Sequence, residues 1–104
     1  MLDKVLLIEQ HYDEINEKLM DPNVVSDQAA YRDLMREYKS LTPVVEKYRE
    51  YKKAAADFEE AKEMLEAGGL DRDFKEMLEE EFAAGKEKTE RLAEELKVLL
   101  LPRD

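Results

Sequence analysis

Residues 31–48 read YRDLMREYKSLTPVVEKY, and their apolar side chains recur every three or four positions without a slip. This spacing places them on one face of an α-helix, the stripe that such a helix buries against a partner. The register passes through Pro43, where a helix interior loses a backbone hydrogen bond at a cost of ~3 kcal/mol. Because a break would normally reset the phase, we favour one kinked helix over a fresh helix capped by Thr42. The stripe consists of Tyr31, Leu34, Tyr38, Leu41, Val45 and Tyr48.

The same stripe extends beyond Tyr48 to Leu65, with one step out of phase, and predicts a helix over about 28–66. Ser26 or Asp27 is the expected cap at its start. The Gly68-Gly69 pair should end the helix in the left-handed conformation and reverse the chain.

Two further stripes flank this helix. The first predicts a helix over about 2–20, which Asp21-Pro22 ends because Pro disfavours helical geometry in the residue before it. The second predicts a helix over about 73–101, with Asp73 and Glu76 as a capping box. The stripes are Val5, Ile8, Tyr12, Ile15 and Leu19, and then Phe74, Leu78, Phe82, Gly85, Thr89, Leu92, Leu96 and Leu99.

No segment shows the alternation of a β-strand, so the sequence predicts an all-α fold. We expect an elongated antiparallel bundle, or coiled-coil hairpin, of three long helices in a single domain over residues 1–104. Ion pairs on the exposed faces should add only ~0.3 kcal/mol each, so packing must dominate. The expected pairs are Glu14 with Lys18, Asp33 with Arg36, Glu87 with Arg91 and Glu94 with Lys97.

The charge balance is strongly acidic. Lys and Arg number 17 and Asp and Glu number 27, which gives a formal net charge of -10. Nucleic-acid affinity comes largely from cations that displace counterions, so extensive direct RNA binding is not expected. A few Lys or Arg on one edge can still touch a phosphate within a larger complex.

The chain has no Cys, which excludes a disulfide framework, a thiolate metal site and a thiol nucleophile. Residues 1–8 hold an apolar patch, but Glu9 interrupts it well short of the ~20 residues that a membrane span needs. No signal-peptide cleavage site follows the patch. We therefore expect no membrane association and a cytoplasmic location.

Side chains that could carry chemistry do not converge. The lone His11 lacks the Glu-x-x-His spacing of helical di-metal sites, so a solvated or packing role is favoured. The run Glu79-Glu80-Glu81 points in three directions on a helix and indicates a solvated face. Four of the five tyrosines lie on the apolar stripes, which favours the core over a base-stacking platform. We expect no catalytic residue, no cofactor and no metal site.

The closing segment KEKTERLAEELKVLLLPRD, residues 86–104, carries a charged helix into a Leu-Leu-Leu-Pro-basic-Asp junction. It resembles the end of the amino-terminal helical domain of bacterial class 1 peptide chain release factors. Residues 31–38 and 44–51 look like the second helix of that domain, and so does the order Asp21-Pro22 through Ser26-Asp27. The similarity covers essentially all 104 residues, and the Pro43 region and the junction favour the release factor 1 branch over the release factor 2 branch.

The resemblance implies an accessory ribosome-docking domain of a translation termination factor that recognises the stop codons UAA and UAG. In this family a Pro-x-Thr motif helps to read the stop codon and a Gly-Gly-Gln loop promotes hydrolysis of peptidyl-tRNA. Neither motif occurs in these residues, so no catalytic or decoding residue is carried over. The native chain should continue past Asp104 into those domains, and this fragment should not terminate translation alone.

The resemblance also implies partners: the ribosome at the stalk base of the large subunit, release factor 3, and other domains of the same chain. Apolar stripes left bare in isolation could pair with a second copy. On periodicity alone, the sequence indicates a helical hairpin that serves as an interaction module, and the alternative function is a stand-alone coiled-coil adaptor or a holdase-like chaperone.

Overall fold

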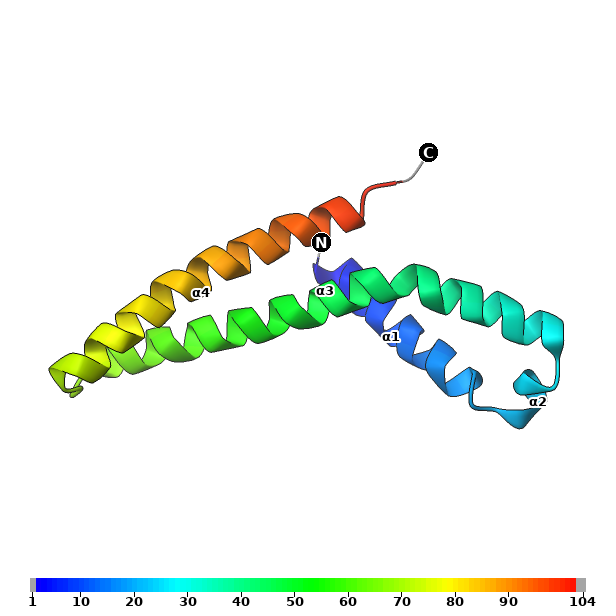
Figure 1. Cartoon of the computed structure of the whole chain (residues 1–104), viewed down its shortest axis with the longest axis horizontal. Coiled ribbons are helices and arrows are strands. Elements are labelled where there is room, and N and C mark those ends of the chain that lie inside the picture. The colour runs from blue at the N-terminus through cyan, green and yellow to red at the C-terminus, as the bar shows by residue number, and fades with distance from the viewer. Residues whose placement is uncertain (1, 103–104) are drawn as a thin grey trace. The chain divides into compact units, whose positions relative to one another are not determined.

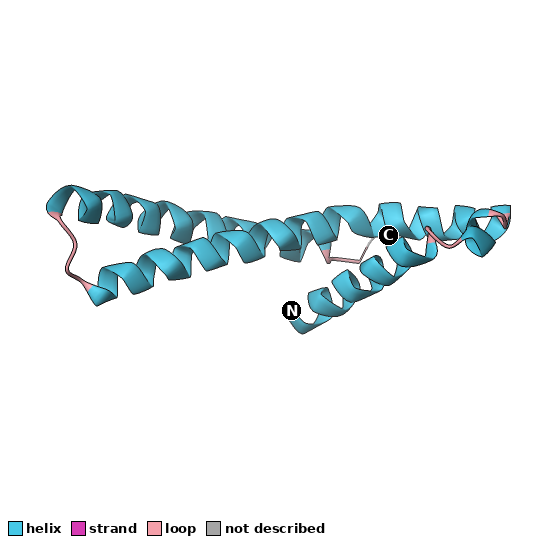
Figure 2. Ribbon diagram, turned by 90° about the horizontal axis from the view of Figure 1, so that it is seen from below, coloured by secondary structure: helices cyan, strands magenta, loops and turns pink. Residues whose placement is uncertain are grey.

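The computed structural model describes residues 2–102, in which four helices follow one another (Figure 1). No strand occurs within this range (Figure 2), and the predicted all-α class is confirmed. Arg103 and Asp104, the end of the Leu-Leu-Leu-Pro junction, lie outside it. The helices are α1 (Leu2–Lys18), α2 (Pro22–Val25), α3 (Gln28–Ala67) and α4 (Arg72–Leu99).

The chain divides into two compact units, Met1–Glu46 and Lys47–Asp104. We refer to them as the first and second units. The first contains α1, α2 and the beginning of α3, and the second contains the rest of α3 and all of α4. Among residues 2–102, no helix combines the length and the apolar character that crossing a bilayer requires.

In the first unit, α1 packs against the beginning of α3 through a buried aromatic contact. The rings of Tyr12 and Tyr38 are stacked with centroids 4.4 Å apart and planes 12° apart. The Thr42 hydroxyl donates to the Tyr38 carbonyl at 2.8 Å and lies 3.1 Å from the Tyr12 hydroxyl. Since Thr42 has one hydroxyl proton, Tyr12 is the donor to Thr42.

These contacts explain how α3 continues through Pro43, which lies inside it. A proline cannot bond the carbonyl four residues earlier, so this turn of the helix is weak on its own. The stack and the hydroxyl pair hold the turn from Tyr38 to Thr42 against α1 from outside. Tertiary contacts therefore oppose the cost of the proline.

The sequence does not predict the short helix α2, because Asp21-Pro22 indicates the end of a helix followed by a loop. The Asp21 carboxylate accepts from the Asn23 amide at 2.9 Å and caps α2. Pro22 occupies the first turn, where its missing N–H is no loss. The sequence signal for a helix start was present, but the same two residues also end a helix.

The ends of the long helices are set by specific residues. The Asp27 carboxylate accepts from the Ala30 amide at 3.1 Å, so Asp27 rather than Ser26 caps α3. Gly68 and Gly69 have φ of 71° and 73°, which confirms the left-handed end. The predicted capping box at Asp73 is wrong: Asp71 caps α4 and accepts from the Phe74 amide at 2.9 Å, because α4 begins at Arg72.

The apolar stripes form the core, as their spacing predicts. Every residue of the three stripes named above is buried or half-buried, and Leu96 and Val5 are 0% exposed. In the second unit, Phe58 of α3 and Phe82 of α4 face each other with ring centroids 4.8 Å apart. The two helices thus form an antiparallel hairpin closed at the Gly68-Gly69 turn (Figure 1).

The predicted surface pairs form only in part. Arg91 lies 3.6 Å from Glu87, and Lys97 lies 3.0 Å from Glu94. Within the described residues no ion pair joins Asp33 to Arg36 or Glu14 to Lys18.

Candidate functional site

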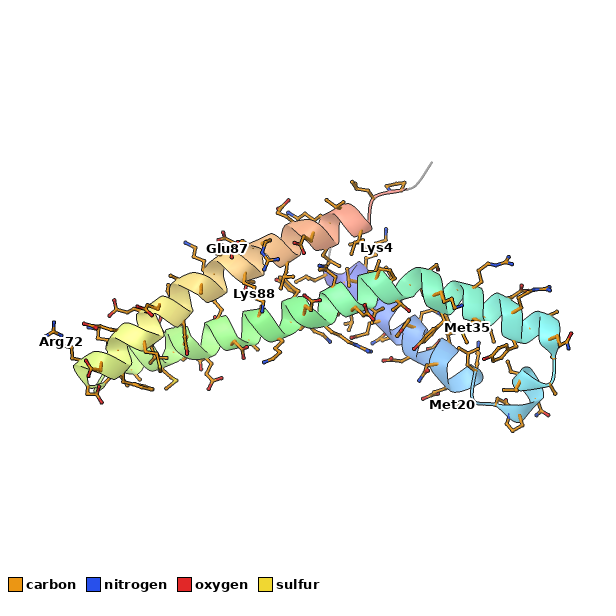
Figure 3. All side chains as sticks on the ribbon, viewed as in Figure 1. Lys4, Met20, Met35, Arg72, Glu87 and Lys88 are labelled. Carbon is orange, nitrogen blue, oxygen red and sulfur yellow. The ribbon has the colours of Figure 1, made fainter. Side chains whose placement is uncertain are left out.

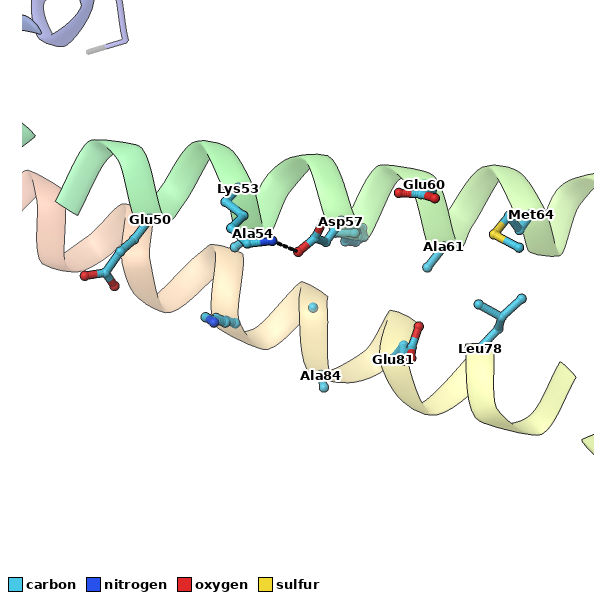
Figure 4. A pocket seen from close by; sticks show the side chains of 13 residues that line it. Glu50, Lys53, Ala54, Asp57, Glu60, Ala61, Met64, Leu78, Glu81 and Ala84 are labelled. Atoms are coloured by element: carbon cyan, nitrogen blue, oxygen red, sulfur yellow. Dashed lines mark hydrogen bonds and ion pairs between the residues drawn. The ribbon is translucent and has the colours of Figure 1, made fainter. Parts of the chain in front are cut away.

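A groove of about 500 Å³ runs along the hairpin of the second unit (Figure 4). We call it the hairpin groove. Both helices contribute to it, from segments that are well separated in the sequence. Its lining residues are Glu50, Lys53, Ala54, Asp57, Phe58, Glu60, Ala61 and Met64 of α3, and Leu78, Glu81, Ala84, Gly85 and Lys88 of α4.

The floor of the groove is apolar and exists because several lining side chains are small. Ala61 is 5% exposed and Leu78 3% exposed, and Figure 4 shows Leu78 pointing from α4 toward Ala61 and Met64 of α3. Close packing continues at Gly85, where an added Cβ would lie 3.4 Å from the Phe58 Cβ. The helices therefore stay close while small residues leave open space beside them.

The rim of the groove is predominantly acidic. Its carboxylates outnumber its cations by four to two. The Lys53 ammonium lies 3.2 Å from the Asp57 carboxylate, so these two charges largely neutralise each other. Glu60 and Glu81 have no ion-pair partner within 4.0 Å among residues 2–102. The rim thus presents carboxylates whose charge the described chain does not balance.

The acidity extends over the end of the hairpin. Residues 57–81 contain 11 Asp and Glu against 3 Lys and Arg, so 3 minus 11 gives -8 of the chain's net -10. Arg72, one of the three cations, lies at the start of α4 (Figure 3) and pairs with Glu76 at 3.4 Å. This end of the hairpin therefore carries most of the net negative charge.

Beyond the groove, away from the turn, four charged residues form a network. The Lys47 ammonium of α3 lies 2.7 Å from the Glu95 carboxylate of α4, and Arg91 approaches Glu95 at 3.1 Å. Glu87 lies 3.6 Å from Arg91 on its other side. The hydrogen bond from Lys47, then that from Arg91, lowers the pKa of Glu95, and the bond to Glu95 raises the pKa of Lys47.

The candidate residues from the sequence lie apart from one another. His11 is exposed in the first unit, with its Nε2 2.5 Å from Glu37 and its Nδ1 4.0 Å from Glu14. Glu79, Glu80 and Glu81 are exposed, and only Glu81 lines the groove. Within residues 2–102, no three His, Cys, Asp or Glu side chains gather as a group able to hold a metal ion.

Two of the five tyrosines are core residues, as predicted. Tyr12 and Tyr48 are each 7% exposed, and the other three are half-buried. Two features were missed. Glu9 is only 8% exposed. Because residues four positions apart lie on the same face of a helix, its spacing from Val5 could have indicated this burial. The groove was also missed, because small residues such as Ala84 and Gly85 do not distinguish an open space from a tight contact.

A second hollow, of about 450 Å³, lies on α3 in the first unit. Its lining is basic, in contrast to the hairpin groove, and Figure 3 marks its position through Met35. It is formed by one face of one helix and has no wall from another element. The lining residues are Tyr31, Arg32, Met35, Arg36 and Lys39.

Comparison with known proteins gives a consistent match over the chain. The family model described as the PCRF domain matches residues 8–104. Peptide chain release factor 1 of Listeria monocytogenes serovar 1/2a is 49% identical over 104 residues, that of Alkaliphilus oremlandii 42%, and that of Caldicellulosiruptor saccharolyticus 41%. Each match covers 100% of this chain and 29% of the relative. No solved structure matches the chain.

Proposed function

Because the chain belongs to the PCRF domain family and is similar over its whole length to bacterial peptide chain release factors 1, we propose that it is an accessory ribosome-docking domain of a translation termination factor. The observation that carries the proposal is the identity of 41–49% across all 104 residues. The chain spans less than a third of the length of these relatives. We propose that other parts of a longer protein carry out the chemistry of termination.

The proposed full-length factor recognises UAA and UAG and promotes hydrolysis of peptidyl-tRNA, and we propose that the groups that do so lie outside residues 1–104. The helical hairpin supports a positioning role. The 28 residues of α4 span ~42 Å at 1.5 Å per residue, packed along α3 by a buried stripe. Such a pair of helices resists bending and can hold a contact surface at a fixed distance from the rest of a protein.

The proposed docking place is the stalk base of the large ribosomal subunit, with release factor 3 as a further partner and the cytoplasm as the location. The family resemblance supports these finer proposals. The charge is compatible with docking through proteins at that place rather than through extensive RNA contact, because a net charge of -10 opposes phosphate binding.

Ribosome pelleting tests the proposal. Full-length protein should sediment with ribosomes that hold UAA or UAG in the decoding site, and much less with ribosomes that hold a sense codon. Removal of residues 1–104 should weaken that association without abolishing peptide release at high factor concentration. A stand-alone adaptor or a holdase would show no association that depends on the codon.

A further inference from the structure

We propose that the hairpin groove docks a basic amphipathic helix of a partner protein. The inference rests on the proposed docking role and names the chemistry of the partner at one surface. Three features of the groove support it: its apolar floor, its acidic rim and its position on the most negatively charged part of the chain.

The floor suits apolar side chains from one face of a helix. Phe58 and Met64 are half-buried, so each keeps apolar surface that water still reaches. An amphipathic helix binds in such a groove by inserting residues spaced three or four positions apart. Methionine adapts its shape to different side chains and is frequent in grooves that accept helices.

The acidic rim favours a helix that carries positive charge. Glu60 of α3 and Glu81 of α4 line the groove on both sides and have no ion-pair partner among the described residues. Lys or Arg at the edges of an inserted apolar face would meet these carboxylates while their aliphatic stems cover the floor. The remaining charge of residues 57–81 adds a long-range field that attracts a cationic partner.

The same charges disfavour the other occupants of such a groove. A second copy of the chain brings a net charge of -10 toward a rim that is already negative. An RNA strand brings one negative charge per nucleotide and would be repelled more strongly. A basic amphipathic protein helix can place apolar side chains on the floor and cations beside the carboxylates of the rim.

Charge reversal with a matched control tests the role of the rim. The probe is a synthetic helical peptide with Leu on one face and Lys on the other, titrated into the full-length protein. Glu60→Lys with Glu81→Lys reverses charges on the rim. Glu59→Lys with Glu80→Lys makes the same change of net charge on adjacent exposed residues outside the groove. The rim variant should weaken the Kd roughly tenfold or more, and the control less than about threefold.

A neutral substitution tests the floor. Ala84→Trp places a large side chain in the groove, whereas Ala83→Trp places it on an exposed position that does not line the groove. The first should weaken peptide binding roughly tenfold and the second should leave it unchanged. Circular dichroism melts within a few degrees of wild type establish that each variant is folded, so a lost affinity reports on the groove.

Several outcomes would overturn the inference. One is an equal loss of peptide affinity in the rim variant and its charge control. Another is a peptide affinity that Ala84→Trp leaves unchanged. A dimer in sedimentation that Ala84→Trp dissociates would assign the groove to a second copy instead. Binding of a single-stranded RNA that Ala84→Trp weakens and Ala83→Trp does not would assign it to nucleic acid.

Ribosome pelleting of the same proteins separates this inference from the proposed function. If wild type does not sediment with ribosomes, the proposed function fails, while the peptide titrations still decide the partner class of the groove. If wild type sediments and the peptide titrations show no preference for the groove, only the present inference fails.

Discussion

Gly85 of α4 lies directly against Phe58 of α3, so that a Cβ on Gly85 would be 3.4 Å from the Phe58 Cβ and 3.5 Å from its Cα. The Phe58 ring in turn meets Phe82 with centroids 4.8 Å apart. A residue without a side chain thus occupies the middle of the α4 stripe because the backbone of α3 passes close by. This contact fixes the distance between the helices beside the hairpin groove.

The contact distances at Gly85 predict opposite effects for a small and a large side chain. A methyl group just fits, so Gly85→Ala should raise the free energy of unfolding by ~0.5–1 kcal/mol through helix propensity. Gly85→Leu should lower it by ~1–3 kcal/mol because the added atoms must push α3 away. Thermal and urea unfolding measure both, and a destabilised Gly85→Ala would show that the helices are closer than described.

Leu96 should not tolerate a charge. It is 0% exposed, so Leu96→Asp places an unpaired carboxylate in the core and should cost several kcal/mol, ~3–5. Val98, two residues on, is 65% exposed, and Val98→Asp should change stability by less than ~0.5 kcal/mol. Equal melting temperatures for the two variants would mean that the wrong face of α4 is assigned to the core.

The Tyr12 hydroxyl should stabilise the first unit through its part-buried hydrogen bond to Thr42. Tyr12→Phe keeps the stack on Tyr38 but removes the donor to Thr42, and should cost ~0.5–1.5 kcal/mol. Tyr51→Phe is the control, since no hydrogen bond of the Tyr51 hydroxyl is present in the described chain, and should be near neutral. Urea unfolding of both variants compares the two hydroxyls, and equal costs would contradict a specific role for Tyr12.

Stability should fall in acid partly through Glu95. The hydrogen bonds from Lys47 and Arg91 lower the pKa of Glu95 in the folded protein. The ionised carboxylate therefore stabilises the fold fully above the ordinary carboxyl pKa of 4.5, and this stabilisation is lost as the pH falls through the folded-state pKa. Lys47 has a raised pKa, so its contribution is complete below 10.5 and is lost as pH rises through its folded-state value.

Lys47→Met should therefore flatten the decline in melting temperature between about pH 5 and 3 without removing it, because Arg91 still bonds Glu95. Lys53→Met, which removes a lysine from an exposed pair, is the control for the change in net charge. The melting temperature of Lys53→Met should decline with falling pH as steeply as that of wild type. An unchanged decline in Lys47→Met would mean that the pair with Glu95 does not persist in solution.

Local chemistry explains why parts of the fold could be predicted. The stripe from Tyr31 to Tyr48 predicts a helix because only one periodicity fits it, and Gly68-Gly69 predicts the turn because few residues adopt a positive φ. The start of α4 was missed because Asp71 and Asp73 are both good caps, and the choice between them depends on where the chain leaves the turn.

The candidate site could not be predicted in the same way. Its walls come from residues 50–64 and 78–88, and which residues face each other depends on the register of α3 against α4. Small residues such as Ala61 and Gly85 are compatible with either a tight contact or an open space, and only the position of the opposite helix decides between them.

By itself, the sequence determined that this protein is helical, acidic and free of Cys, and where its long helices turn, because these properties depend on residues within a few positions of each other. Tertiary structure alone decided that Lys47 meets Glu95 and that the hairpin carries a groove. Those features arise from side chains far apart along the chain, and their energies depend on packing that no local pattern encodes.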